Sequence, residues 1–322
     1  MNCQGLGNFK KRRDVLDYLK SGKYSIICVQ DTHFISNNER LILAEWGYKA
    51  IFSSFSSNSR GVAIFFQNTF QLQLNKTICD PNGNFVLIDI TIDDIRMSIA
   101  NIYAPNNDNP HFFENLKKLI INQGNQNVII VGDWNLLLNP TIDGVNYKHI
   151  NNPNARKKVQ QIINELSLYD VWRDQNPDKH LYTWARKLSP NNIQMGRLDF
   201  FLISETLHHM HQGANILPGY RTDHSLITLS LKLCKQTKSS TFWKFNCSLL
   251  KNKEYIEEIK KVINENKINY AAYPYNPNII ETIDNELYQS YISPQLFFEM
   301  LLLEIRSKSI AFSSAMKKKR KY

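Results

Sequence analysis

The sequence predicts an α/β domain over residues 1–234, followed by a helical connector or appendage over residues 235–322 that ends in a basic tail. Apolar runs typical of strands alternate along the first part with segments of helical periodicity, and several of these runs end abruptly in polar residues. From about residue 235, apolar residues become fewer and Lys, Asn and Tyr more frequent. We expect the chemistry in the first part and a connector without chemistry in the second.

Composition and charge narrow the class of protein. The 322 residues are 43% hydrophobic and 21% charged, which is ordinary for a soluble globular chain of this length. The net charge is +10, which favours a polyanionic partner such as nucleic acid. Part of this charge is local, because Lys317 to Lys321 form a run of five cationic residues. The charge alone therefore indicates a nucleic-acid partner only weakly.

Cysteine usage and the absence of long apolar runs indicate the compartment. The five cysteines are odd in number, scattered, and never spaced as C-x-x-C, which argues against a disulfide framework and against a thiolate zinc site. The sequence has no run long enough to cross a bilayer and no signal-peptide pattern. We expect an intracellular protein, nuclear or cytoplasmic and not secreted, with no membrane partner and no small-molecule cofactor.

The elements of the first half follow from local periodicity. Residues 9–20 have the spacing of a helix, and residues 24–30 form an apolar strand followed by Asp31. The sequence then predicts a helix at 38–46 and four strands separated by Asn, Gly and Asp turns, at 61–66, 70–78, 85–92 and 95–103. The last of these strands ends in Y-A-P-N, from Tyr103 to Asn106.

The second half continues the alternation. We expect helices at 111–121 and 154–168, and strands at 128–131, 197–204 and 225–233. The strand at 197–204 contains one acid, Asp199, which needs a partner because an unpaired buried carboxylate is costly. In the appendage, helices are expected at 253–265 and 294–314, with a loop at 269–278 that contains Pro274 and Pro277.

The run N-V-I-I-V-G-D-W-N, residues 127–135, shows how a strand end can carry chemistry. Its β-branched residues lack alternation, which suits a strand buried on both faces. Gly132 permits a tight turn, after which Asp133 and Asn135 would project into the crevice where open α/β sheets bind ligands. Asp and Asn are also common turn residues, so this run alone leaves both interpretations open.

Polar residues at strand ends recur in six separate places along the chain. Each has an ordinary structural explanation when taken singly, such as a helix cap, a turn or a core tyrosine. Their joint occurrence in this order predicts one site, made of Asn2, Asp31, Tyr103, Asn106, Asp133, Asn135, Asp199, Asp223 and His224.

Residues 2–234, which contain these polar strand ends, resemble the endonuclease/exonuclease/phosphatase superfamily with the DNase I-like fold. The resemblance is strongest to the apurinic-type endonuclease domain of LINE retrotransposon proteins. The matching motifs are N-C-Q-G-L (2–6), Q-D-T-H (30–33), Y-A-P-N (103–106), G-D-W-N (132–135), Y-T-W (182–184), R-L-D-F-F-L-I-S (197–204) and T-D-H-S (222–225). Residues 241–250 and 297–306 resemble the connector that precedes the reverse transcriptase in such proteins. No polymerase follows in this sequence, which we interpret as a truncated element product.

The resemblance implies a four-layer α/β sandwich, in which two packed mixed sheets are flanked by helices and share one site at their edge. It also implies Mg²⁺-dependent hydrolysis of DNA phosphodiesters by a monomer, with Mn²⁺ as an alternative ion. Asp31 would be the principal metal ligand, completed by Asp223 and Asn2. Asp133, held by Asn135, would orient the attacking water.

The remaining roles concern the phosphate. His224 would bind a phosphate oxygen, with Asp199 holding its imidazole and favouring the cation. Tyr103 and Asn106 would donate hydrogen bonds to the phosphate. Thr183, Arg197 and Thr222 are the further expected phosphate or DNA contacts.

The chain departs from the family pattern in ways that affect the site. Asp31 stands where Glu is usual and is one methylene shorter, which would loosen metal binding. Met1 occupies the last position of the usual first strand, so residues 24–30 or the final strand should lack a hydrogen-bonding neighbour and Asn2 should be poorly anchored. Gly196 and Thr222 each replace a usual serine.

Two alternatives to a DNA-nicking enzyme remain. One is a phosphatase of the same fold that acts on a small phosphoester, although the W-C-D-R motif of the inositol phosphatase branch is absent. The other is a catalytically impaired remnant that binds DNA through its basic surface.

Overall fold

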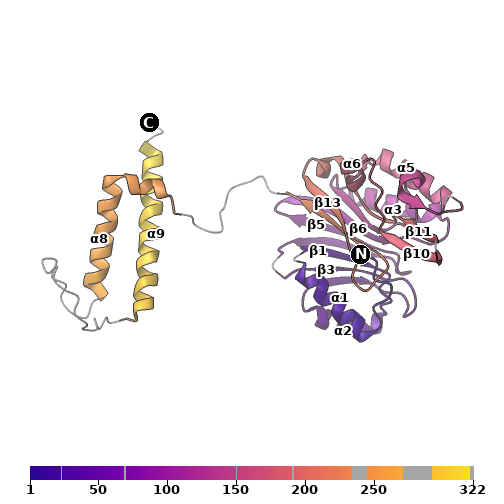
Figure 1. The fold of residues 1–322 in the computed structure, drawn as a ribbon, viewed down its shortest axis with the longest axis horizontal. Coiled ribbons are helices and arrows are strands. Elements are labelled where there is room, and N and C mark those ends of the chain that lie inside the picture. Colours follow the sequence, from indigo (N-terminus) through magenta and orange to yellow (C-terminus); the bar gives the residue numbers. More distant parts are fainter. Residues whose placement is uncertain are drawn as a thin grey trace. The chain divides into compact units, whose positions relative to one another are not determined.

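The computed structural model describes residues 1–22, 24–68, 70–149, 151–190, 192–233, 245–270 and 292–319. The chain forms two compact units, Met1–Lys235 and Gln236–Tyr322 (Figure 1). Most of the expected loop at 269–278 and the last residues of the basic run Lys317 to Lys321 lie outside the described residues. Each unit is described separately below.

A six-stranded mixed sheet forms the centre of the first unit. Its order is β4-β5-β6-β7-β12-β9, in which β6 and β7 are parallel and the other neighbours are antiparallel. The strands are β4 (Gln73–Cys79), β5 (Phe85–Ile92), β6 (Ile95–Tyr103), β7 (Val128–Asp133), β12 (Asp199–Ser204) and β9 (Leu168–Asp170). Strand β7 is buried at every position, as its apolar run predicts.

A second layer of strands faces this sheet and is divided into two pieces. One piece has the order β1-β3-β2, with β1 (Ile26–Gln30), β3 (Val62–Phe66) and β2 (Ala50–Ser53). The other is the hairpin of β13 (His211–Leu217) and β14 (Leu226–Leu231). Within the described residues, the only strand that pairs with β1 is β3 and the only strand that pairs with β14 is β13, while residues 1–3 make a short parallel bridge to the end of β1.

Three apolar clusters hold the layers together. The first fills the space between the two strand layers and includes Ile64 of β3 and Ile88 of β5. The second lies on the outer face of the six-stranded sheet, under α3 (Pro110–Gln123) and α5 (Pro153–Glu165). The third lies under α1 (Phe9–Ser21) and α2 (Glu39–Trp46), on the other side of the molecule (Figure 1). These four layers confirm the predicted α/β sandwich.

The remaining elements of the first unit are short. A three-stranded sheet has the order β10-β11-β8, with β10 (Trp184–Ser189), β11 (Asn192–Gly196) and β8 (Gly144–Val145). The short helices are η1 (Ser36–Asn38), α4 (Pro140–Asp143), α6 (Val171–Gln175) and α7 (Glu205–His208). The expected helix at 154–168 is wrong at its end: α5 stops at Glu165, and Leu168 begins β9 and is buried in the core cluster. Tertiary packing decides where the helix ends, because in the local sequence the apolar Leu168 fits the spacing of a helix as well as that of a strand.

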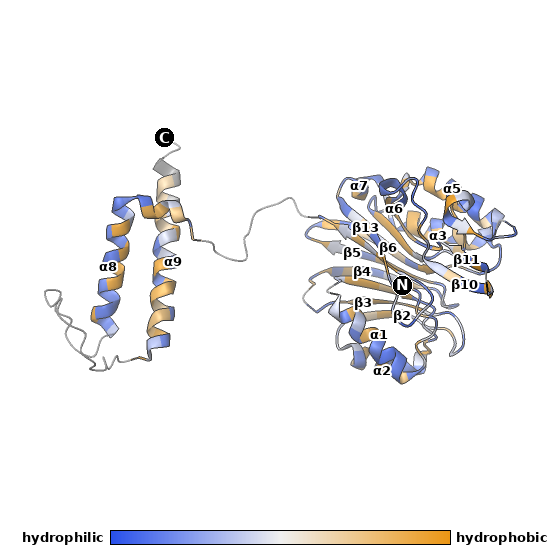
Figure 2. Ribbon diagram, in the orientation of Figure 1, coloured by the Kyte–Doolittle hydropathy of each residue, from blue (hydrophilic) through white to orange (hydrophobic). Residues whose placement is uncertain are grey.

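The second unit contains η2 (Cys247–Lys251), α8 (Lys253–Tyr270) and α9 (Pro294–Lys319), so the two expected helices are confirmed. The two long helices pack through the Tyr255 hydroxyl, which lies 2.7 Å from the Ser309 hydroxyl, and through the ring of Phe312. Figure 2 shows apolar residues along α9, and Phe298 and Leu303 are exposed there. In the part of the chain that the structure describes, every helix is too short or too polar to cross a membrane.

Candidate active site

Three neighbouring strands place polar side chains at one edge of the six-stranded sheet. Tyr103, at the end of β6, is in register with Asp133, at the end of β7, and Asp133 is in register with Asp199, at the start of β12. Asp199 and Asp133 are therefore direct cross-strand neighbours although they are 66 positions apart in sequence. The pairing of β7 with β12 brings the two carboxylates together.

The turn after β7 fixes the position of Asp133. Gly132 has φ +149°, and a Cβ there would lie 1.9 Å from the Ile102 carbonyl oxygen of β6, so only glycine fits. The Trp134 ring stacks on Phe200 with 4.7 Å between ring centroids and donates its indole N–H to the Phe200 carbonyl. Asn135 donates its backbone N–H to Asp133 Oδ1 at 3.0 Å. These contacts hold the carboxylate in one orientation.

Asn2, Asp133, Asp199 and His224 form a buried cluster. Asp199 Oδ2 lies 2.8 Å from His224 Nδ1, and His224 Nε2 lies 3.9 Å from Asp133 Oδ2. The Asn2 carboxamide donates to the same Asp133 oxygen at 2.9 Å. Asn2 is buried and its backbone forms a parallel bridge with Gln30, so the expectation that Asn2 is poorly anchored is wrong. Three backbone hydrogen bonds to β1 hold this end of the chain without a full strand.

Burial and neighbouring charges shift the proton affinities of this cluster. Burial, reinforced by the charge of Asp199, raises the pKa of Asp133 to about 7. Burial opposes the charged form of His224, but the Asp199 carboxylate outweighs it and raises the pKa of His224 to about 9. The imidazole is therefore a cation at neutral pH, next to a carboxylate that is poised to gain or lose a proton.

Asp31 and Asp223 line the same pocket from other strand ends. Asp31 has φ +51° and accepts the Arg60 backbone N–H at 3.0 Å through Oδ1, which also lies 3.1 Å from His33 Nε2. Asp223 accepts the Trp184 indole N–H at 3.1 Å. The pocket has a volume of about 530 Å³ and is lined by Asn2, Gln4, Asp31, Tyr103, Asn106, Asp133, Asn135, Tyr147, Asn151, Trp184, Arg186, Gln194, Leu198, Asp223 and His224.

Three expected phosphate contacts do not line this pocket. Thr183 is buried, and its hydroxyl accepts the backbone N–H groups of Leu198 and Asp199. Thr222 donates its hydroxyl to the Asn2 carbonyl and accepts the His224 N–H. Both side chains position the strand ends that carry the site.

The expectation that Arg197 contacts phosphate is not met. Its guanidinium is buried and donates to the carboxylates of Asp143 and Asp170, at distances of 2.6–3.2 Å. Burial of a guanidinium is possible here because two carboxylates neutralise it. Arg197 therefore joins α4 to β9 inside the domain and is not available to a ligand in the pocket.

Comparison with known proteins agrees with this geometry. Residues 1–224 match the family model of the Endonuclease/Exonuclease/phosphatase family. The chain belongs to this family. A search of curated proteins finds the Transposon TX1 uncharacterized 149 kDa protein of Xenopus laevis, 26% identical over 263 residues that are 81% of this chain and 20% of that protein. It also finds DNA-(apurinic or apyrimidinic site) endonuclease 2 of Schizosaccharomyces pombe, 28% identical over 48% of this chain and 33% of that protein. The matched parts thus span about a fifth and a third of these relatives.

Solved structures of the family share the fold. The AP endonuclease LMAP from Leishmania major superposes with a TM-score of 0.61 at 16% identity, over 71% of this chain and 85% of that one. The endonuclease domain of TRAS1, a telomere-specific non-LTR retrotransposon, superposes with a TM-score of 0.54 at 14% identity, over 73% of this chain and 97% of that one. These likenesses establish the DNase I-like fold of the first unit.

The donor set of the pocket fits a hard divalent cation. Ligand atoms of Asp133, Asp199 and His224 lie within 4.8 Å of one another, but the protonated His224 has no lone pair for a metal. The carboxylates of Asp31 and Asp223 and the carboxamide of Asn2 line the same pocket. Asp199 Oδ1 is buried and has no hydrogen-bond partner among the described residues, which leaves an oxygen for a cation or a water. Carboxylate and carboxamide oxygens are the ligands that Mg²⁺ and Mn²⁺ prefer.

Several residues that line the pocket were not among the site residues predicted from the sequence. Trp184 and Arg186 lie two apart on β10 and both line the pocket, which the period of two in a strand could have indicated. Tyr147, Asn151 and Gln194 carry no sequence signal, because only the packing of the small β8-β11-β10 sheet and the preceding loops brings them to the pocket. His33 was part of a recognised motif, but its contact with Asp31 depends on the left-handed backbone of both residues.

Proposed function

We propose that this protein is a metal-dependent endonuclease that nicks DNA by hydrolysing a backbone phosphodiester. The observation that carries the proposal is the buried cluster of Asn2, Asp133, Asp199 and His224 at the floor of an open polar pocket. It pairs a carboxylate, the proposed base, with a cationic imidazole about 4 Å away, an arrangement that suits the hydrolysis of a phosphodiester. Membership of a family that includes endonucleases and the net charge of +10 support a DNA substrate.

Within this proposal, Asp133 accepts a proton from the attacking water. Its pKa of about 7 matches a base that works near neutral pH. Hydrogen bonds from the Asn2 carboxamide and from the Asn135 N–H hold its carboxylate in one orientation. The Asn135 carboxamide donates to the Ala104 carbonyl at 2.7 Å and so ties the turn after β7 to the end of β6. The base is thereby held rigidly before substrate binds.

His224 and Tyr103 stabilise the negative charge that develops on the phosphate during the reaction. Asp199 keeps the imidazole cationic, so that His224 Nε2 can donate to a phosphate oxygen. Burial raises the pKa of Tyr103, which keeps its hydroxyl protonated as a donor, and Asn106 lines the same pocket. Thr183 and Thr222 act through the backbone, by holding Asp199 and His224 in place.

We assign the metal to Asp31, Asp223 and the Asn2 carboxamide oxygen, because Asp133 Oδ2 and Asp199 Oδ2 face the cationic imidazole of His224, which opposes a second cation there. Bound Mg²⁺ or Mn²⁺ would neutralise phosphate charge and assist the leaving oxygen. The short Asp31 side chain is oriented by the Arg60 N–H and by His33.

Nicking of supercoiled plasmid in the presence of Mg²⁺ tests the proposal. Asp133→Ala and His224→Ala should each lower the nicking rate by about 10²- to 10⁴-fold, because each removes a proton-transfer or charge-stabilising group. Asp178→Ala and His209→Ala are matched controls at exposed positions outside the pocket and should nick at the rate of the unaltered chain. Equal rates for all five proteins would refute the assignment.

The same assay separates the two alternative functions. Release of phosphate from soluble phosphomonoesters without nicking would indicate a phosphatase. Binding to DNA that weakens with salt, without cleavage at any Mg²⁺ or Mn²⁺ concentration, would indicate a binding remnant.

A further inference from the structure

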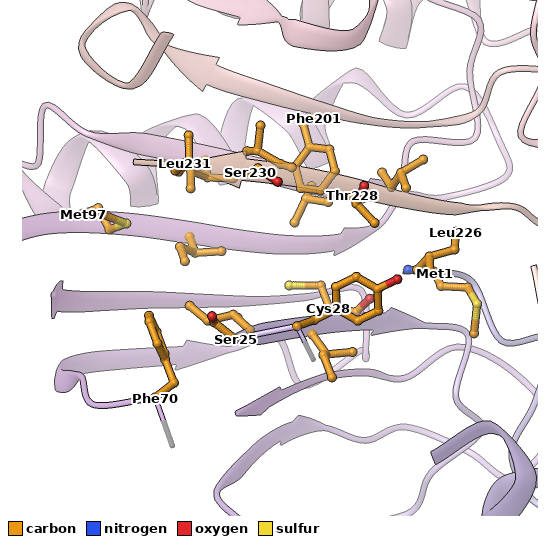
Figure 3. A pocket seen from close by; sticks show the side chains of 18 of the residues that line it. Met1, Ser25, Cys28, Phe70, Met97, Phe201, Leu226, Thr228, Ser230 and Leu231 are labelled. Carbon is orange, nitrogen blue, oxygen red and sulfur yellow. The ribbon is translucent and has the colours of Figure 1, made fainter. Parts of the chain in front are cut away.

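Two hollows in the first unit differ in chemistry. The groove between β1 and β14 has a volume of about 500 Å³, and its lining includes Met97 and Phe201 (Figure 3). None of the described residues that line this groove has a charged side chain. The pocket of the candidate active site shares no lining residue with it and includes Arg186 of β10, which has no role in the proposed mechanism. Of the two hollows, only the pocket offers a cationic side chain to an anionic ligand.

Two neighbouring side chains hold the guanidinium of Arg186. Its Nε–H donates to Oε1 of Gln194 on β11 at 2.8 Å, and its Cζ lies 5.6 Å from the centre of the Trp184 ring. The Trp184 indole N–H is held in turn by Asp223 at 3.1 Å. In the part of the chain that the structure describes, the two terminal nitrogens of the guanidinium have no hydrogen-bond partner. A planar guanidinium with two open donor groups matches two oxygens of one phosphate.

Tyr147 brings a hydroxyl to the same pocket. Its ring lies against Gly144 of β8 and Gly196 of β11, which are in register with each other. A Cβ at Gly196 would lie 2.6 Å from the Tyr147 hydroxyl, and a Cβ at Gly144 would lie 3.1 Å from the ring. The loop is fixed beside them, because the Asn146 carboxamide donates to the Ile193 carbonyl at 2.6 Å. Two facing glycines therefore leave the space that the tyrosine fills.

The Tyr147 hydroxyl is a protonated donor close to Arg186. Residues 194 and 196 are two apart on β11, so Gln194, which binds Arg186, and Gly196, which Tyr147 touches, present the same face of the strand. Burial raises the pKa of Tyr147 to about 12 although the charge of Arg186 opposes the rise, so the hydroxyl keeps its proton at neutral pH. Among the described residues, this hydroxyl has no hydrogen-bond partner.

We propose that the Tyr147 hydroxyl and the Arg186 guanidinium form a second phosphate subsite, which binds the DNA backbone phosphate beside the one that is hydrolysed. This inference rests on the proposed function, which supplies the DNA ligand and assigns His224 and Tyr103 to the phosphate that is attacked. Both groups of the subsite offer donors only, and a phosphate presents acceptors only, whereas the edge of a base pair presents both. A contact to an unreacting phosphate adds affinity and leaves the chemical step unchanged.

Tyr147→Phe tests the hydroxyl, because it keeps the ring between the two glycines. Binding of a labelled DNA duplex is measured by fluorescence anisotropy and nicking is measured on supercoiled plasmid. We expect Kd and the KM of nicking to rise at least about tenfold while kcat stays within about twofold. Tyr48→Phe, at an exposed position outside the pocket, is the control and should match the unaltered chain in both assays.

Arg186→Gln tests the charge through the dependence of Kd on salt. Loss of one phosphate contact should weaken binding and lower the slope of log Kd against log salt concentration by about 1. Tyr147→Phe should leave this slope unchanged, because the hydroxyl is neutral. The control is Lys187→Gln, which removes a cation from the next residue of β10, on the opposite face of the strand and outside the pocket. Equal losses of slope in Arg186→Gln and Lys187→Gln would indicate bulk attraction and would overturn the proposal.

The outcomes separate the subsite from the nicking activity. Normal nicking with an unchanged Kd in Tyr147→Phe would overturn the subsite alone, because the tyrosine would then serve only to pack against the glycines. Weaker binding in Tyr147→Phe and Arg186→Gln, with no nicking by the unaltered chain, would support the subsite and contradict only the proposed activity. An unaltered chain that binds no duplex would contradict both.

Discussion

The proton balance of the site depends on two residues whose pKa values shift for opposite reasons. Asp133 resists ionisation because it is buried beside another acid, whereas His224 holds its proton because Asp199 lies 2.8 Å from Nδ1. An anion next to a cation in a buried site is stabilised in the pair and costly when either member is removed. Asp199 is therefore a positioning residue that acts through His224.

The raised pKa of His224 predicts a pH-dependent stability. Because its folded pKa of about 9 exceeds its ordinary value of 6.5, the imidazolium stabilises the fold fully below pH 6.5 and progressively less as the pH rises to about 9. The contribution lost is on the order of 3 kcal/mol. Urea unfolding at pH 6 and pH 9.5 should show this decline in the unaltered protein and a smaller one in His224→Gln. An equal decline in both proteins would contradict the role of His224.

Arg197 illustrates how burial changes the role of a cation. Removal of its guanidinium in Arg197→Leu would leave the buried Asp170 without a cation and Asp143 with Arg173 alone, at a cost of about 3–5 kcal/mol in the free energy of unfolding. Urea unfolding measures this loss, and Arg13→Leu, at an exposed position, is the control. A phosphate contact would give the opposite result, namely unchanged stability and weaker DNA binding.

At the scale of elements, the contact between β6 and β7 positions Asp133, the proposed base. These are parallel neighbours, and β7 brings its Gly132 against the β6 backbone at Ile102. The close approach lets Tyr103 and Asp133 end side by side in the pocket. The turn that follows is anchored by Trp134, which is buried between Phe113 and Phe200.

Gly132→Ala should therefore disturb both stability and the site. The added Cβ would lie 1.9 Å from the Ile102 carbonyl oxygen, so the strands must separate, at a cost of roughly 2–3 kcal/mol. Thermal unfolding should show a lowered Tm, and plasmid nicking should be slower than in the unaltered chain. The control is Gly7→Ala, where a Cβ meets nothing within 4 Å. Equal stability of the two variants would show that the strand contact tolerates the change.

At the scale of the whole molecule, charge rather than a single contact should govern DNA binding. The chain carries 39 Lys and Arg against 29 Asp and Glu. Neutralisation of even two phosphates would lower the affinity about tenfold between 50 and 200 mM salt. Fluorescence anisotropy with a labelled duplex measures this slope, and Asp133→Ala should bind with the same slope while it fails to nick. An affinity independent of salt would contradict phosphate neutralisation.

The sequence by itself determined the fold class and most of the site. Apolar runs that end in Asp31, Tyr103 or Asp133 are local patterns, because burial and turn formation act over a few neighbouring residues. The order of these motifs is enough to identify the family. Local patterns also gave the long helices and the eight strands β1, β3–β7, β12 and β14, but not the strands β2, β8–β11 and β13 or the short helices α4, α6 and α7.

Tertiary structure alone decided which side chains share an environment. Arg197 carries a charge that suits phosphate, yet Asp143 and Asp170, far away in sequence, enclose it. Asn2 is anchored by β1 and Asp133, which no local pattern reveals. The groove between β1 and β14 likewise exists only because two distant strands face each other across an apolar floor. Long-range pairing and burial set these environments, and neither is encoded in the spacing of neighbouring residues.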